Sequence, residues 1–437
     1  MAQKQIRWLL GELPTLVNGG VLDGAAAERL RRHYEASAGK SRNWALVTFG
    51  LLGGTLVGLG VILLLAHNWE NLSRAARTAL AFSPLVASQI LVGWSLRSGK
   101  NSTAWREGIG AFWMLSIGAA IALVAQIYHI PGDAGRFALT WMLLSLPVIY
   151  LLNATGPALA YLAGMVFWAI DAQEHGGQAV LFWPLAALVL PHTIAAAREN
   201  VYAVRPVLLF WGIALALCIA TGVTLEKILP GLWIIVYGGL LAAFYLAGEF
   251  WFAEAPAFWQ KPLLVVGGVG ATVLAFMLSC EWPWGDIGWH YRHYGAEYHG
   301  WAAILDYALT IALPAAAIIL LAGSVRRGKV RAILPGVFPI LAILGYTFVT
   351  LTDRNGGAQA LFNLYLFILG LGLLIRGFRA QLIGTVNAGM LVLFGLILLR
   401  FFDEDLGFVF RGVVFVLLGA AFLAVNLVLA RKKGAAS

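Results

Sequence analysis

Histidines and carboxylates recur in the polar connections between apolar segments of this 437-residue chain. Imidazole and carboxylate groups together are the usual material of proton relays, metal sites and acid–base catalysis. The histidines expected at one face are His67, His129, His175, His290, His293 and His299. The acids expected there are Glu70, Asp133, Asp171, Glu174, Asp353, Asp403, Glu404 and Asp405. Two interpretations stay open, namely an outward-facing polar pocket or connections that are polar only because they lie in water.

Asp306 is an acid about one turn inside an apolar segment. A carboxylate costs roughly 2.5–3.5 kcal/mol at the middle of a membrane and less near its surface, so an intramembrane acid is a functional candidate. The alternative is a side chain that reaches the outer interface. Other polar residues inside apolar segments are expected to form hydrogen bonds between helices. These residues are Gln126, His192, Asn363, Asn387 and Asn426.

The longest polar connection, residues 281–300, is rich in tryptophan, tyrosine and histidine. This composition is typical of a segment in the lipid headgroup layer. His290 and His293 can share a helical face and supply half of a metal site, but no third ligand follows at matching spacing. We therefore predict a lid over the pocket, and we expect no metal and no cofactor.

The segment from Arg400 to Arg411 places an arginine on either side of three consecutive acids. We expect ion pairs of these arginines with Asp403 and Asp405 to hold the last two apolar segments together. The sequence contains no phosphate-binding Walker loop, no Gly-x-Ser-x-Gly elbow and no His-Glu-x-x-His motif. No motif therefore identifies a reaction.

The segments that position these residues are those of a membrane protein. Hydrophobic residues make up 60% of the chain and charged residues 12%, whereas about a quarter of residues are charged in soluble domains. A bilayer core of about 30 Å needs roughly 20 helical residues. Approximate spans are 44–66, 76–97, 106–128, 137–153, 156–170, 178–197, 204–222, 229–248, 262–280, 301–324, 331–352, 358–375, 382–401 and 410–430. The prediction is an all-α, polytopic transmembrane bundle of about 14 spans.

The lysines and arginines fall mainly in the connections on one side of these spans. The positive-inside rule then places both termini in the cytoplasm and the histidine-rich face outside. The formal charge of +9 is interpreted as topogenic, because the basic residues are scattered through short loops rather than massed on one face. We expect the lipid bilayer as a partner and no nucleic acid.

Residues 1–43 form a predicted cytoplasmic helical preface, followed by the bundle at 44–430 and a basic tail at 431–437. The preface has apolar residues at helical spacing on both sides of a Gly19-Gly20 break. It is either a membrane-surface hairpin that anchors the topology or a docking module for a cytoplasmic protein at residues 1–40. Within the bundle, prolines interrupt two spans, which indicates transport sites or kinks without function. These prolines are Pro184, Pro191, Pro335 and Pro339.

Three segments carry a family resemblance: His67-Asn68-Trp69-Glu70-Asn71-Leu72, then Ala125-Gln126-Ile127-Tyr128 running to Gly132-Asp133, and Arg400-Phe401-Phe402-Asp403 with Arg411-Gly412. With them the chain resembles the bacterial multi-pass membrane proteins grouped as domain of unknown function 2157, mainly over residues 1–155. The resemblance implies a bacterial cytoplasmic membrane location and no established activity. It marks six positions without assigning roles: His67, Asn68, Trp69, Gln126, Tyr128 and Asp133.

The leading functional prediction is a transporter or flippase-like bundle that binds a small or amphipathic solute through an outward-facing cavity. The expected substrate-binding residues are His67, Asn68, Trp69, Glu70, Gln126, Tyr128, His129, Asp133 and Asp306. One alternative is an enzyme that acts on a lipid-linked substrate at the outer leaflet, using Glu70 or the acids at 403–405. The other is a membrane scaffold or sensor with a cytoplasmic docking hairpin. Whether the chain is an enzyme stays open, and its catalytic residues are unknown.

Overall fold

The computed structural model describes residues 3–38, 69–99, 102–225, 231–285, 287, 301–401, 412, 413 and 416. Every regular element in these residues is a helix, which confirms the predicted all-α class. The chain divides into two compact units, Met1–Arg77 and Thr78–Ser437. The predicted first span, 44–66, and nearly all of the predicted last span, 410–430, lie outside the described residues.

The N-terminal unit contains a helical hairpin of α1 (Gln3–Asn18) and α2 (Gly24–Ala38). The two helices pack on each other, and Leu13 and Ala27 are the residues that become buried. Gly20 has a φ of +67°, a left-handed conformation that glycine adopts without steric cost, and this allows the chain to turn between the helices. A short helix, η1 (Trp69–Asn71), lies near the end of this unit.

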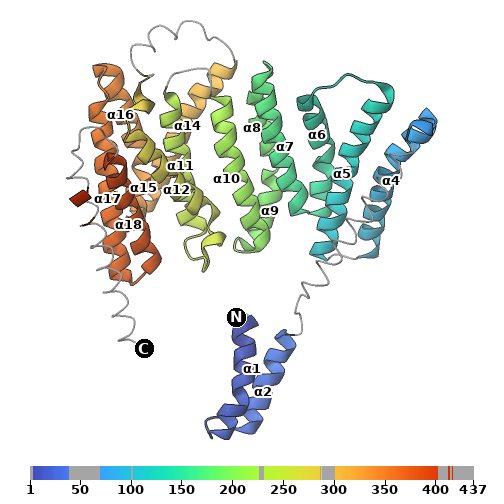
Figure 1. The fold of residues 1–437 in the computed structure, drawn as a ribbon, viewed down its shortest axis with the longest axis horizontal. Coiled ribbons are helices and arrows are strands. Elements are labelled where there is room, and N and C mark those ends of the chain that lie inside the picture. The colour runs from blue at the N-terminus through green and yellow to red at the C-terminus, as the bar shows by residue number, and fades with distance from the viewer. Residues whose placement is uncertain are drawn as a thin grey trace. The chain divides into compact units, whose positions relative to one another are not determined.

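The larger unit is a bundle of helices that run side by side (Figure 1). Its helices are α4 (Arg74–Ser98, which begins in the first unit), α5 (Thr103–Tyr128), α6 (Ala134–Leu152), α7 (Thr155–Glu174), α8 (Phe182–Ala187), α9 (Leu190–Asn200), α10 (Val204–Thr224), α11 (Leu232–Trp251), α12 (Pro262–Leu278), α14 (Trp301–Arg326), α15 (Ile333–Gly336), α16 (Phe338–Thr352), α17 (Gly356–Ala380) and α18 (Ile383–Phe401). Short 3-10 turns accompany them: η2 (Ala179–Leu181), η3 (Phe258–Gln260), η4 (Trp282–Trp284) and η5 (Val330–Ala332).

Ten segments of the described chain are long and apolar enough to cross a membrane. Two of them, Ala179–Asn200 and Val330–Thr352, combine several helices, and α12 is a shorter apolar helix of 17 residues. The chain is therefore a membrane protein with many apolar helices. The count of fourteen spans and the cytoplasmic placement of both termini stay predictions.

Two spans are broken where the sequence places prolines. One break separates α8 from α9 just before Pro191, and the other separates α15 from α16 just before Pro339. Proline has no N–H, so a helix carbonyl one turn earlier loses its usual partner. At the first break, the hydroxyl of Tyr161 on α7 donates a hydrogen bond at 3.0 Å to the carbonyl of Leu185, which also accepts the N–H of Leu188. A neighbouring helix therefore adds to the hydrogen bonding of the backbone at the break, where a bilayer offers no water.

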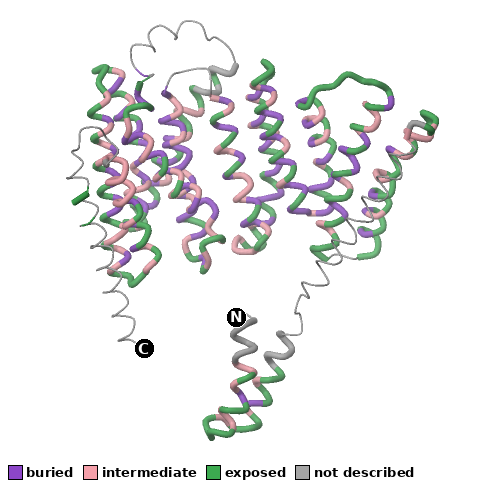
Figure 2. Tube along the Cα trace, viewed as in Figure 1, coloured by how far each residue is buried: buried purple, intermediate pink, exposed green. Residues whose placement is uncertain are grey.

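The most buried helix is α11, which packs against α10, α12, α14 and α16 (Figure 2). Glycines allow this close approach, because lipid gives no hydrophobic drive for helix association and packing must supply it. A Cβ on Gly239 would lie 2.5 Å from the backbone nitrogen of Pro314 on α14. One on Gly248 would overlap the backbone of Leu264 on α12. The α11 backbone therefore rests directly on its neighbours.

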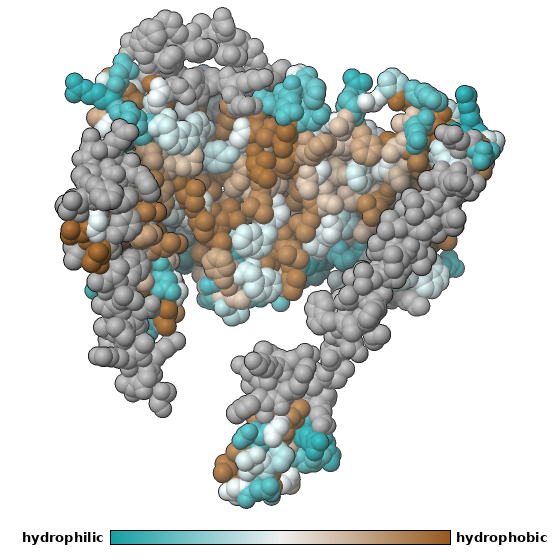
Figure 3. Space-filling model, in the orientation of Figure 1, coloured by the Kyte–Doolittle hydropathy of each residue, from teal (hydrophilic) through white to brown (hydrophobic). Residues whose placement is uncertain are grey.

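Hydrophobic residues form a band across the described helices, and hydrophilic residues gather toward the helix ends (Figure 3). Large apolar side chains on these helices are exposed, for example Ile311 at 70%, Ile319 at 71% and Leu351 at 77%. Extended apolar surface of this kind is rare on monomeric soluble proteins. It is the surface expected of helices whose solvent is hydrocarbon.

Candidate functional site

Four predicted binding residues lie at the connection between α5 and α6, and all four are exposed: Gln126, Tyr128, His129 and Asp133. His129 ends α5 in a left-handed conformation with a φ of 54°. The Asp133 carboxylate caps α6 by accepting the main-chain N–H three residues later at 2.6 Å. The Tyr128 hydroxyl lies 3.3 Å from the hydroxyl of Thr78 on α4. These residues therefore shape the connection, and their part in binding stays a prediction.

The other predicted residues near the first span belong to the N-terminal unit. The Arg77 guanidinium lies over the Trp69 ring at 5.9 Å from its centroid. Glu70 lies in η1, where only its main chain is described. His67 and Asn68 lie outside the described residues. No arrangement of these four residues with the α5–α6 connection is therefore established.

Asp171 and His175 form a titratable pair at the C-terminal end of α7. The His175 Nδ1 donates to the Asp171 carbonyl at 2.9 Å and lies 3.5 Å from its carboxylate. A Cβ on Gly135 would overlap that carboxylate, so Asp171 lies against the first turn of α6, where the helix dipole favours an anion. The backbone hydrogen bond, and then the charges of Asp171, Glu174 and Asp133, raise the pKa of His175. The structure thus brings three predicted groups, Asp133, Asp171 and His175, to one end of α6 and α7.

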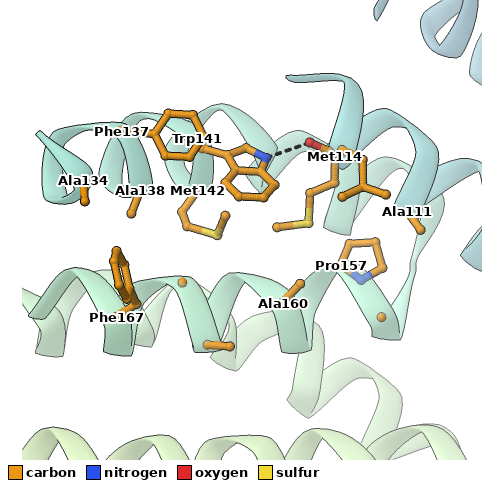
Figure 4. A pocket seen from close by; sticks show the side chains of 14 residues that line it. Ala111, Met114, Ala134, Phe137, Ala138, Trp141, Met142, Pro157, Ala160 and Phe167 are labelled. Atoms are coloured by element: carbon orange, nitrogen blue, oxygen red, sulfur yellow. Dashed lines mark hydrogen bonds between the residues drawn. The ribbon is translucent and has the colours of Figure 1, made fainter. Parts of the chain in front are cut away.

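An apolar groove lies between α5, α6 and α7 (Figure 4). Its volume is about 690 Å³, within the range of small-molecule sites. Only apolar residues and glycines line it. They are Ala111, Met114, Leu115, Ala134, Phe137, Ala138, Trp141, Met142, Gly156, Pro157, Ala160, Ala163, Gly164 and Phe167. The groove thus offers space for hydrocarbon and no polar side chain for a polar solute.

Glycines on the flanking helices accept the large side chains of α6. The Trp141 ring lies where a Cβ on Gly118 of α5 would be, at 2.6 Å, and its Nε1 donates to the Met114 carbonyl at 2.7 Å. Met142 packs in the same way on Gly164 of α7. Figure 4 shows the Trp141 bond at the wall of the groove. Helix α6 is therefore fixed on both sides, and the groove is what the three helices leave between them.

The groove opens on the surface of the bundle. Ala111, Ala160, Ala163 and Phe167 line it and are exposed. From Gly156 to Phe167 it follows α7 for about 16 Å at 1.5 Å per residue, which is roughly half of a bilayer core. A molecule in the groove would therefore be accessible from the surrounding hydrocarbon.

A carboxylate lies at the end of the groove where α7 begins. The N-cap of α7, Ala154, has no side-chain acceptor. Instead, Glu107 of α5 accepts the main-chain N–H groups of Thr155 and Gly156, each at 2.7 Å. Gly156 also lines the groove, so an ionisable group lies directly beside apolar space. This cap supplies charge where the helix dipole is positive.

Behind this end lies a partly buried polar group centred on Arg205 of α10. Its guanidinium donates to the Asn153 side-chain oxygen and lies 3.3 Å from the His192 Nε2. His192 is 3% exposed and directly follows Pro191 at the broken span. These bonds join α9 and α10 to the α6–α7 turn. The predicted interhelical hydrogen bond of His192 is therefore present.

Asp306 lies on a different group of helices. It is in α14, which packs against α11, α15 and α16, whereas α5 packs against α6 and α7. The described residues therefore do not join Asp306 to Gln126, His129 and Asp133, and its side chain lies outside the described part. Its role in binding stays a prediction.

One tryptophan at the start of the predicted lid is buried in the bundle. Trp284 is only 2% exposed, and its Nε1 donates to the Leu278 carbonyl at 2.9 Å. Its ring centroid lies 6.0 Å from that of Phe362. The indole is buried because its N–H finds a carbonyl at the end of α12 and its ring finds apolar partners. Residues 286 and 288–300 lie outside the described residues, so the lid itself is not tested.

Arg400 near the end of α18 joins three helices. Its guanidinium donates to the Asn363 side-chain oxygen on α17 at 3.2 Å and to the carbonyl of Ser279 after α12. The predicted partners Asp403 and Asp405, and also Arg411, lie outside the described residues. Arg400 therefore helps to hold α18 in place through neutral acceptors. The ion pairs with Asp403 and Asp405 stay a prediction.

Sequence reasoning missed Glu107 and Arg205. Both lie at the second position of a predicted span, 106–128 and 204–222, whereas Asp306 lies about one turn inside its span. A charge at the end of a span normally reaches the interface, so the sequence carries no signal for the interhelical contacts of these two residues. Among the described residues, no group of three histidine, cysteine, aspartate or glutamate residues is arranged to hold a metal ion.

Comparison with known proteins gives one result. Residues 14–158 match the family model described as "Predicted membrane protein (DUF2157)", which confirms the resemblance over that part of the chain. The match includes Glu107 and ten lining residues of the groove, from Ala111 to Pro157. The C-terminal hairpin at 400–412 falls outside it. No curated protein and no solved structure matches the chain.

Proposed function

We propose that this protein binds the hydrocarbon part of an amphipathic molecule in the α5–α6–α7 groove and moves that molecule across a bacterial cytoplasmic membrane. The observation that carries the proposal is the groove itself, about 690 Å³ of space lined by apolar side chains and open to the bundle surface. Space of this kind next to lipid suits an acyl chain, because it offers dispersion contacts and no competing hydrogen bonds.

The two ends of the groove helices suit a polar headgroup. Gln126, His129 and Asp133 lie at the end that we predict to face outward, and Glu107 lies at the other. In the proposal, the headgroup of the ligand moves from one polar end of the groove to the other, while its acyl chain remains in the groove. The remaining predicted residues, His67, Asn68, Trp69, Glu70 and Asp306, stay part of this hypothesis as the outer polar lining.

Energy for directed movement would come from an ion gradient. The sequence contains no nucleotide-binding loop, and histidine with carboxylate is the usual material of a proton relay. Without such coupling the protein would equilibrate its ligand between the two leaflets.

Photolabelling tests the binding step. The purified full chain in lipid nanodiscs is illuminated with a phospholipid that carries a photoactivatable group on its acyl chain, and labelled peptides are mapped. We expect label on α5, α6 and α7, and at least a threefold loss in Ala160→Phe and Ala163→Phe, whose side chains would fill the exposed groove. Ala119→Phe is the matched control, because Ala119 is exposed on α5 and does not line the groove. Equal loss in all three variants would contradict the proposal.

Reconstitution tests movement separately. Vesicles containing the protein and a fluorescent phospholipid are treated with an external quencher, and the rate at which inner-leaflet lipid becomes accessible is measured. We expect Ala160→Phe to slow this rate and Ala119→Phe to leave it unchanged. Normal rates in a variant that has lost acyl-chain labelling would show that the groove binds lipid without moving it.

A further inference from the structure

A second recess lies on α17, far along the chain from the groove. It has a volume of about 420 Å³ and is lined by Gly372, Ile375, Arg376, Arg379 and Ala380. A Cβ on Gly372 would lie 3.8 Å from Leu334 of α15, so α15 stands next to the recess. The two arginines are three residues apart and therefore share one helix face. They lie in the last turns of the span, at the end that we predict to face the cytoplasm.

Arg376 lies near α11. It is half-buried, and its guanidinium is within electrostatic range of the Tyr245 hydroxyl. The Tyr245 hydroxyl also lies within electrostatic range of Glu249 and Arg331. Arg376 is thus partly enclosed by the bundle while it lines the recess. A partly enclosed guanidinium loses less conformational entropy when it binds a ligand.

Positive charge exceeds negative charge around Tyr245 and the end of α11. The Lys329 Nζ donates to the main-chain carbonyl of Glu249 at 2.9 Å, and the Arg327 guanidinium lies 4.5 Å from the Phe250 ring centroid. Glu249 is buried, at 4% exposed, and its Oε2 has no hydrogen-bond partner among the described residues. One buried carboxylate is therefore outnumbered by the cations near it, which are Arg327, Lys329, Arg331 and Arg376.

The recess has no described acidic partner for its arginines. Within the described residues, the ion pairs closer than 4.0 Å involve neither Arg376 nor Arg379. A topogenic role needs only positive charge on this side of the membrane and does not need a recess. A planar guanidinium fork, in contrast, matches the oxygens of a phosphate, and basic pockets between helices on the cytoplasmic side bind phosphate headgroups.

We infer that the α17 recess binds a phosphate group, with Arg376 and Arg379 as its donors. The phosphate belongs either to the headgroup of an anionic phospholipid or to a soluble phosphate compound, since both present the same oxygens. This site is separate from the apolar groove, and its occupancy does not depend on the proposed transport. Its ligand would bind at the membrane surface, where Arg379 is exposed.

Native mass spectrometry of the full chain in neutral detergent tests this inference. The protein is incubated with phosphatidylglycerol, and the fraction carrying bound lipid is measured. We expect Arg379→Gln to lower this fraction at least threefold and Arg379→Lys to lower it less, because lysine keeps the charge but not the fork. Arg354→Gln is the control, since Arg354 is an exposed arginine just before the other end of α17. Tyr245→Phe, which removes the hydroxyl near Arg376, should also weaken binding.

The second arm identifies the source of the phosphate. Glycerol 3-phosphate and inorganic phosphate are added in excess to the lipid-bound protein. Retained lipid identifies the headgroup as the ligand, whereas displacement by millimolar glycerol 3-phosphate identifies a soluble phosphate compound. Equal lipid binding by the wild type and Arg379→Gln, with the helical circular dichroism of both unchanged, would overturn the inference. An equal loss in Arg354→Gln would also overturn it, because general surface charge would then account for the binding.

Discussion

Glu107 of α5 accepts the main-chain N–H of Gly156 on α7 at 2.7 Å, so one helix supplies the N-terminal cap of another. The same carboxylate accepts the N–H of Thr155 with its other oxygen. Helix α7 begins at Thr155 after a tight turn in which Ala154 provides no acceptor. The end of the groove therefore depends on a residue almost fifty positions earlier in the chain.

We expect Glu107→Ala to destabilise the bundle by about 2 kcal/mol. Two N–H groups would lose a charged acceptor, and a hydrogen bond to a charged group contributes about 1.5–3 kcal/mol. Glu107→Gln keeps one acceptor oxygen, so its stability should lie between that of the wild type and that of Glu107→Ala. The measurement is the free energy of unfolding in mixed detergent micelles. Glu174→Gln serves as the control, because Glu174 is an exposed acid at the other end of α7; a loss of similar size there would contradict the capping role.

We expect Gly118→Ala to destabilise the protein by about 1–3 kcal/mol, the usual range for an extra methyl group in a packed site. The added Cβ would lie 2.6 Å from the Trp141 ring, and Trp141 is held by its bond to the Met114 carbonyl. Gly108→Ala on the same helix is the control, because nothing lies within 4 Å of its Cβ position. Thermal unfolding followed by circular dichroism should show a lower midpoint for the first variant only. A lower midpoint for both would indicate a general intolerance of α5.

The helices themselves could be predicted from the sequence. Apolar length alone locates them, because every span must satisfy its own backbone in lipid. The breaks before Pro191 and Pro339 also follow from the sequence, since proline cannot continue a helix without loss of a hydrogen bond. Hydropathy does not determine which helices touch, and so it did not indicate that α14 and α5 belong to different packed groups.

The groove could not be predicted from the sequence for the same reason. Its lining residues are alanines, glycines and large apolar side chains like those elsewhere in the chain. What makes the groove is that Trp141 and Met142 turn to Gly118 and Gly164 and leave the space between. Polar residues are conspicuous in a sequence, but their contacts are not. Asp133, for example, caps its own helix through local backbone geometry.

The charge state of His175 should depend on Asp171. The pKa of His175 is raised above its ordinary value of 6.5, first by the hydrogen bond to the Asp171 carbonyl and then by nearby acidic charges. The imidazolium is therefore favoured below the raised pKa, and its ion pair with Asp171 is lost as the pH rises through that value. Asp171→Asn should lower the pKa only part of the way, because the carbonyl bond remains.

Histidine ring resonances in NMR spectra, recorded against pH, measure this pKa. The spectrum of His175→Gln identifies the resonance of His175, and Asp171→Asn is then titrated in the same detergent. Glu174→Gln should produce a smaller decrease than Asp171→Asn, because Glu174 contributes less to the shift. An unchanged pKa in Asp171→Asn would show that the carboxylate has no influence on the imidazole.

The bond between Arg400 and Asn363 should stabilise the contact of α18 with α17. Asn363→Ala removes an acceptor 3.2 Å from the Arg400 Nε and leaves that donor to other groups, so we expect a loss of about 1–2 kcal/mol. Arg400→Gln should cost more, because it also removes the bond to the Ser279 carbonyl. The free energies of unfolding of both single variants and the double variant measure the coupling. Asn387→Ala on the exposed side of α18 is the control and should change stability little. Additive single-variant losses would show that the two side chains act independently, with Arg400 held mainly by its other partners.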